Sequence, residues 1–223
     1  ALPVVDAEKR LTGIITVDDI MDVMEQEATE DFQRMAAMAP SDENYLDTNV
    51  FTLAKHRITW LLILMISGTF TGRIIAGFNN VLESVVVLAT FIPMLMDTGG
   101  NAGSQSSTLI IRGLATGEIT LKDVWKVLWK ELRISIIVGI VLAAANYARL
   151  RLLEKVDPLV SLTVSLTLVF TVIVSKLIGG TLPLLAKRLK IDPAIMAGPL
   201  ITTIVDALSL IVYFEVASTL LHI

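Results

Sequence analysis

The sequence predicts an all-α integral membrane protein with five transmembrane helices. Hydrophobic residues make up 54% of its 223 positions, and the mean hydropathy is +0.72. Five hydrophobic segments follow an acidic N-terminal part, and they cover residues 58–77, 84–111, 134–147, 159–185 and 193–221. The third segment reaches the roughly 20 residues of a span only if it begins near Val127.

The composition restricts the available chemistry. The chain has no cysteine and two histidines, which excludes disulfides, thiolate metal sites and a histidine-based zinc cluster. Oxygen ligands remain, and these suit hard cations such as Mg²⁺. The sequence also lacks a His-Glu-x-x-His motif and a phosphate-binding Gly-x-x-x-x-Gly-Lys loop, so we expect no enzyme.

Charge divides the chain into two parts. Residues 1–50 hold 12 acids and three bases, a net charge of −9, and residues 51–223 hold 10 acids and 15 bases, a net charge of +5. The opening residues are polar and lack a continuous apolar core, so we expect no signal peptide there. More basic residues lie in the loops on the same side as the N-terminal part than in those on the opposite side. This predicts a multi-pass plasma-membrane protein with a cytoplasmic N-terminus.

The first residues predict a strand over 2–5, a turn, a strand over 11–16 and a helix capped by Thr16 or Asp18. Their Pro-Val-Val-Asp, Gly-Ile-Ile-Thr and Asp-Ile steps resemble the last part of a CBS domain. An unrelated strand–turn–strand–helix fragment is the alternative. The resemblance implies that residues 1–24 are a CBS remnant and that the chain is a piece of a longer protein.

An amphipathic acidic helix is expected from Val17 to about Met38, and Pro40 then interrupts it. The pattern indicates either an ordinary solvated face or a group of carboxylates that a divalent cation neutralises. Its candidate cation-binding acids are Asp18, Asp22, Glu25, Glu27, Glu30 and Asp31.

Few charged residues lie inside the hydrophobic segments, and each is a functional candidate. In the fifth segment, Thr202, Asp206 and Ser209 recur at helical spacing, with Asp206 near the middle. Asp206 is the best candidate for an intramembrane cation ligand. We expect Asp97 and Lys176, both near the middle of their segments, to form a structural ion pair, either within one chain or between two copies.

The second segment carries a polar stretch within residues 93–112. Asn101 and Gln105 share one helix face, while the Gly99-x-x-x-Gly103 spacing permits close helix contact. Gly99 and Gly100 could also break the helix and turn carbonyls toward a cavity, because polar backbone at membrane depth is tolerated where it lines one. Helix packing and ion contact are both open for these glycines.

The membrane part resembles the MgtE family of magnesium channels, a likeness carried by Thr98-Gly-Gly-Asn-Ala-Gly-Ser-Gln105, Leu109-Ile-Ile-Arg-Gly-Leu-Ala-Thr116, Asp192-Pro-Ala194 and Thr203-Ile-Val-Asp206. The resemblance implies a homodimer with five spans per protomer in residues 56–223. It also implies a connecting plug helix in residues 25–55 that closes the pore when cytoplasmic Mg²⁺ binds its acids. Asp206 would then be the central ion site. Gly198 stands where the family can have Asn, which leaves only a carbonyl there.

We therefore expect Mg²⁺ to be both transported ion and regulator, with the bilayer and a second copy as partners and no nucleic acid. The alternatives are an ion-coupled carrier of Mg²⁺, Co²⁺ or Mn²⁺, for which Glu215 is the only spare acid, and a non-conducting membrane scaffold.

Overall fold

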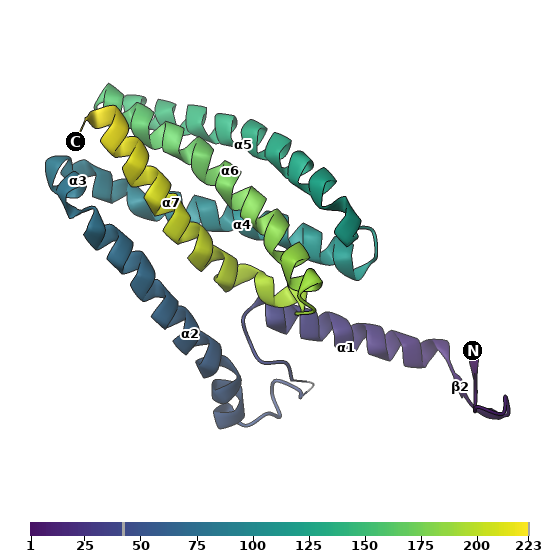
Figure 1. The fold of residues 1–223 in the computed structure, drawn as a ribbon. Helices are drawn as coiled ribbons and strands as arrows, with labels where there is room; N and C mark the ends of the chain where they lie inside the picture. Colours follow the sequence, from purple (N-terminus) through teal and green to yellow (C-terminus); the bar gives the residue numbers. More distant parts are fainter. Residues whose placement is uncertain (42, 223) are drawn as a thin grey trace.

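The N-terminal part is a small hairpin followed by a helix in the computed structural model, which describes residues 1–41 and 43–222 (Figure 1). Strands β1 (Leu2–Val5) and β2 (Leu11–Ile15) pair antiparallel and lead into α1 (Val17–Met35). Thr16 caps α1, because its Oγ1 accepts from the Asp19 N–H while its own N–H donates to Asp19 Oδ2. The predicted strands, cap and amphipathic helix are confirmed, and α1 ends at Met35 rather than near Met38.

Long helices make up most of the rest of the described chain. They are α2 (Val50–Gly77), α4 (Ile92–Ala115), α5 (Val124–Leu152), α6 (Pro158–Arg188) and α7 (Gly198–Leu221), joined by α3 (Asn79–Ser84) and the 3-10 turns η1 (Val86–Phe91), η2 (Leu121–Asp123) and η3 (Pro193–Met196). Successive long helices run in opposite directions, so the two termini lie at opposite ends of the molecule (Figure 1).

Three helical stretches of the described chain are long and apolar enough to cross a membrane: Val50–Gly77, Pro158–Arg188 and Pro193–Leu221. Helices α4 and α5 have 24 and 29 residues, enough for about 36 and 44 Å. Both carry polar and charged residues along part of their length. The all-α membrane class is therefore supported, and five spans remain a proposal.

Helices α4, α5, α6 and α7 pack into one bundle. Its main apolar core lies toward the end that holds the C-terminus and includes Leu88, Leu95, Val164, Leu210 and Phe214. There the Tyr213 hydroxyl donates to the Leu88 carbonyl at 2.9 Å, which satisfies a fully buried polar group. The core fixes the ends of four helices and leaves the middle of the bundle to small residues.

Helix α4 is continuous across its glycines, so of the two alternatives for Gly99 and Gly100 the one that required a break in the helix is not observed. A Cβ at Gly99 would lie 2.9 Å from Ser209 Oγ, and one at Gly100 would lie 2.9 Å from Thr202 Cγ2. A Cβ on Gly179 of α6 would overlap the Gly103 carbonyl. The glycines let α6 and α7 approach α4 closely, which confirms the packing alternative.

The fifth hydrophobic segment, expected to be one helix over 193–221, is interrupted near its start. Asp192 caps the short turn η3 by accepting the Ala194 N–H at 2.8 Å. The chain then bends at Gly198, whose φ of +48° is unfavourable for side-chain-bearing residues, and α7 begins. A Cβ at Gly198 would also overlap the carbonyl oxygen of Met35, so this glycine lets the end of α1 lie against the start of α7.

Helix α2 stands apart from the bundle and diverges from it toward the α1 end (Figure 1). It packs mainly on α7, and none of its residues is buried in the single chain. Its apolar side chains therefore need a cover that this chain does not provide, either lipid or another protein surface.

Candidate ion pathway

Asp206 lies in the middle of α7 and is half-buried. Among the described residues, its carboxylate accepts no hydrogen bond and forms no ion pair. Thr202, one turn earlier, uses its hydroxyl to donate to the Pro199 carbonyl at 2.9 Å. Ser209 is fully buried, and its Oγ has no partner among the described residues. An uncompensated carboxylate within an apolar helix is costly, which keeps Asp206 as a candidate functional position.

Helix α4 presents two different faces. Gly99, Gly100 and Gly103 are buried against α6 and α7, whereas Asn101 and Gln105 are exposed. The exposed face continues through the polar residues Asp97, Thr108 and Arg112. A polar strip of this length cannot face hydrocarbon without a large desolvation cost, so it requires water or a second polar surface.

Asp97 belongs to this exposed strip, on the helix that packs against α7 at Gly99 and Gly100. No ion pair joins Asp97 to Lys176 within the part of the chain that the structure describes. Lys176 instead lies beside Ser106, nine residues further along α4, which is about 13 Å along the helix axis. The pair expected from the sequence is therefore not formed within one chain, because Lys176 of α6 reaches the buried face of α4 at the depth of Ser106, whereas Asp97 lies on the exposed face at another depth.

Lys176 belongs to a buried polar network that the sequence reading missed. Its Nζ donates to Ser106 Oγ at 3.4 Å, and that hydroxyl donates to Glu131 Oε2 at 2.6 Å. Lys176 and Glu131 are only 5% and 6% exposed. Glu131 lies in a stretch rich in Lys and Trp, which is typical of a helix end outside the membrane, so the sequence did not indicate a buried position. The sequence signal that could have indicated this network is Ser106, a small polar residue on the buried, largely apolar and glycine-rich face of α4.

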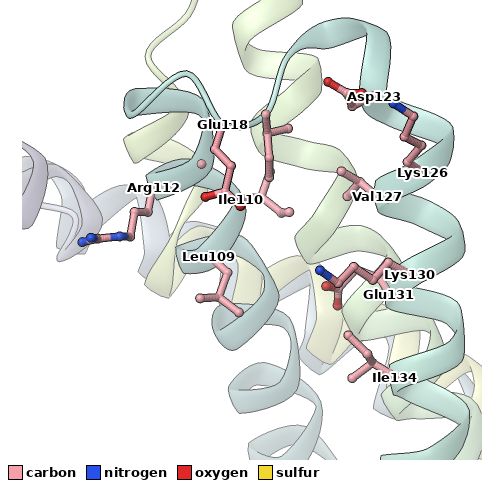
Figure 2. Close-up of a pocket in the computed structure, with 12 residues that line it drawn as sticks. Leu109, Ile110, Arg112, Glu118, Asp123, Lys126, Val127, Lys130, Glu131 and Ile134 are labelled. Carbon is pink, nitrogen blue, oxygen red and sulfur yellow. Dashed lines mark hydrogen bonds and ion pairs between the residues drawn. The ribbon is translucent and has the colours of Figure 1, made fainter.

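Glu131 also lines a cavity of about 440 Å³ between the end of α4 and the start of α5. Figure 2 shows Asp123 and Lys126 close together at one end of this cavity, with Glu131 further along α5 and Arg112 turned away. Hydrogen bonds from Lys126 and Thr120 lower the pKa of Asp123 to about 2. Because the cavity mixes both charge signs, it does not resemble a site for a simple cation or anion.

The acidic helix α1 meets the bundle only at its C-terminal end. Arg34 forms ion pairs with Glu30 on its own helix and with Asp192 at the start of η3. Met35 packs against the small apolar cluster that holds Ile111 and Ala194. These contacts place the last turns of α1 across the end of the bundle where α7 begins (Figure 1).

The six candidate acids of α1 fall into two groups. Glu27 and Asp31 line a cavity of about 530 Å³ together with Asp192 and Lys187, and Glu30 is held by Arg34. The other three acids are exposed further from the bundle: Asp18, Asp22 and Glu25. Only the C-terminal group therefore lies where α1 approaches α7.

Asp31 shows the electrostatic cost of this approach. Burial, followed by repulsion from Asp192, Glu27 and Glu30, raises the pKa of Asp31 above its ordinary 3.8, and Arg34 opposes the shift. Within residues 1–41 and 43–222, however, no three carboxylate or imidazole side chains are arranged to hold a metal ion. Any cation at this end would retain much of its hydration shell.

The family-model comparison matches residues 92–216 to MgtE, described as a divalent cation transporter. This match spans α4, α5, α6 and most of α7, more than half of the chain. The chain belongs to the MgtE family.

Curated relatives of this MgtE-family chain carry the name magnesium transporter MgtE. The Thermus thermophilus protein is 42% identical over 99% of this chain and 49% of its own length. The Bacillus subtilis protein is 38% identical over 100% of this chain and 49% of its own length. The Enterococcus faecalis protein is 31% identical over 98% and 47%, respectively. The chain thus spans about half the length of the curated relatives it matches.

Proposed function

We propose that this chain passes Mg²⁺ across the plasma membrane through a pore between two copies, with Asp206 as the central ion ligand. The observation that carries the proposal is the exposed polar strip of α4 on a helix that packs directly against the segment of α7 holding the uncompensated Asp206. Membership of a divalent cation transporter family supports the choice of cargo. The magnesium transporter relatives support Mg²⁺ in particular.

Two copies suit the coordination chemistry of Mg²⁺. This ion loses its waters reluctantly and is commonly held by one or two carboxylates with several waters retained. A two-fold axis beside α7 would bring two Asp206 carboxylates to one ion, since each interface residue occurs twice. The same arrangement would turn the polar α4 strips of both copies toward water instead of lipid.

The neighbouring residues have distinct proposed roles. Asn101 and Gln105 line the water-filled path with amide oxygens, and Thr202 continues the wall on α7. Gly99 and Gly100 hold α7 close to α4, which fixes the position of Asp206, and the buried Ser209 lies at the same contact. Gly198 sets the start of α7 and carries no side chain into the path.

We place the α1 end on the cytoplasmic side, since basic residues concentrate there, and assign α1 the role of a cation-sensitive closure. Its C-terminal acids Glu27 and Asp31 lie beside Asp192 at the start of the pore helix. A hydrated Mg²⁺ between them would reduce their repulsion and let the helices of two copies draw together over the opening.

Mg²⁺ flux into liposomes, without a proton gradient, tests the central proposal. Asp206→Asn should lower flux by about tenfold or more, equivalent to about 1.4 kcal/mol. Glu215→Gln is the matched control, because Glu215 is an exposed acid on the same helix, and it should transport normally. Normal flux through a folded Asp206→Asn protein would overturn the assignment. Flux that requires a proton gradient would indicate a carrier, and no flux in the unmodified protein a scaffold.

A further inference from the structure

We propose that the beginning of α5 binds the headgroups of anionic phospholipids at the membrane interface. The binding surface, the α5 basic-aromatic face, consists of Trp125, Trp129, Lys130 and Arg133 of α5 together with Lys122 of the preceding turn η2. It requires the chain to lie in a membrane and does not depend on Mg²⁺ transport.

The two tryptophans of this face are unusually exposed. Trp125 is 81% exposed and Trp129 is 60% exposed, although indole rings bury much apolar area when a partner is available. They lie four residues apart, so both rings project from one side of α5. Tryptophan concentrates at membrane interfaces, where its ring reaches the apolar region and its N–H meets polar headgroups.

Uncompensated positive charge surrounds these rings. Lys122, Lys130 and Arg133 are exposed, and none of them joins an ion pair among residues 1–41 and 43–222. Lys130 also lines the cavity of about 440 Å³ beside Glu131 (Figure 2), so Lys122 and Arg133 are the cations that face only outward. The Arg133 guanidinium lies 5.9 Å from the centre of the Trp129 ring, in cation–π range. The nearby acids do not cancel this charge, because Asp123 pairs with Lys126 and Glu131 is buried against Ser106.

The residues that follow fix the depth of the face. Along the same outward side, α5 next exposes Ile136, Ile137, Ile140 and Val141, which are 41–65% exposed. A basic and aromatic band directly followed by an apolar strip reproduces the order of headgroup and acyl chain in a bilayer. A second copy is a poor occupant, since a symmetric contact would bring the same cations together.

An apolar groove beside this face could hold an acyl chain. Leu121, Val124, Leu184 and Leu185 line a cavity of about 310 Å³ between the start of α5 and the end of α6. Arg188 lies in its lining and is exposed, so a further cation stands beside the groove. Anionic phosphate with an attached hydrocarbon chain matches this pairing of charge and apolar surface.

Tryptophan quenching by brominated lipid in vesicles tests the proposal. The chain has three tryptophans, so Trp60→Phe leaves only Trp125 and Trp129 as reporters. The full chain is placed in phosphatidylcholine vesicles with a minority of phosphatidylglycerol, and the bromine is carried by one lipid or the other. We expect anionic lipid to be enriched about fivefold around the tryptophans, the factor for one surface cation at about 1 kcal/mol, and to lose this preference at high salt.

Charge-removing variants distinguish lipid binding at this face from a general attraction of anionic lipid to a basic protein. Lys122→Gln/Lys130→Gln/Arg133→Gln in the same background should abolish the enrichment. Lys9→Gln/Lys55→Gln/Lys155→Gln removes the same number of exposed charges elsewhere and should retain it. Equal quenching by both lipids, or equal loss in both variants, would overturn the proposal. So would tryptophans that no lipid quenches, which would point to a protein contact.

Discussion

Lys176 and Glu131 are buried charges in the interior of the bundle, and Ser106 joins them across three helices. Removing one charge leaves the other without compensation in a low-dielectric surrounding, which typically costs about 3–5 kcal/mol. Removing both avoids that penalty. The network therefore ties α4, α5 and α6 together at one depth, close to the crossing of Gly103 and Gly179.

A double-mutant cycle checks this coupling. Lys176→Met and Glu131→Gln should each strongly lower the free energy of unfolding. The double variant should lose about 0.5–3 kcal/mol less than the sum of the two single losses. Lys176→Met with Asp97→Asn is the control pair and should be additive, because the structure does not bring these two residues together. Additivity in the Glu131 pair would contradict the network.

At the scale of elements, the decisive contact is the one between the end of α1 and the start of α7. It combines an ion pair from Arg34 to Asp192, apolar packing of Met35 and the close approach at Gly198. The Arg34–Asp192 pair is partly exposed, at 29% and 27%, so solvent screens it and its contribution is about 1 kcal/mol. The acids at this contact make it sensitive to protons and cations.

The raised pKa of Asp31 predicts a pH dependence of α1 docking. The docked helix binds a proton at Asp31 more readily than the undocked helix, so docking is strengthened at low pH and weakens as pH rises above the ordinary value of 3.8. Hydrogen-exchange protection factors over residues 27–35 should therefore fall between acidic and neutral pH. Asp31→Asn should remove the part of this change that Asp31 causes, whereas Asp18→Asn, at the exposed end of α1, should not.

The proposed cation response belongs to the same contact. Millimolar-range Mg²⁺ should increase exchange protection over residues 27–35 more than Na⁺ at equal ionic strength, because a divalent ion screens neighbouring carboxylates more effectively. Residues 18–25, whose acids lie away from the bundle, should respond less. Identical exchange in both salts would leave the acids of α1 as an ordinary solvated face.

At the scale of the whole molecule, a single chain leaves two surfaces without a suitable environment. The polar strip of α4 cannot face lipid, and α2 buries none of its residues within the chain. A second copy placed against α4 and α7 would cover or hydrate the strip and could also contact α2. The α5 basic-aromatic face then remains outside, toward lipid.

Cysteine cross-linking tests this arrangement, because the 223 residues of this chain contain no cysteine that would react in its place. Asn101→Cys should give a covalent dimer with a short bis-maleimide reagent in native membranes, since the α4 strips of two copies would face each other. Ile137→Cys, on the exposed apolar side of α5, should stay monomeric. Dimers from the α5 position alone would place the interface on the opposite side of the bundle.

Local patterns in the sequence determined much of this protein. Hydrophobic runs predicted the long helices, the Thr16 cap and α1 followed from residues within one turn of each other, and the position of Asp206 on a polar line followed from helical spacing. These features depend on contacts between residues close in sequence. The glycine spacing likewise indicated close packing, which the contacts of Gly99 and Gly103 confirm.

Tertiary structure alone decided the partners of the buried charges and the course of the backbone at the glycines. Nothing local to Lys176 distinguishes Asp97 from Glu131, since the choice depends on how far α4 slides along α6 and which face it turns inward. That register is set by the fit of side chains against Gly99, Gly103 and Gly179, which is a property of three helices packed together. The same packing kept α4 unbroken, because helices that fill the space beside its glycines remove any advantage of unwinding them.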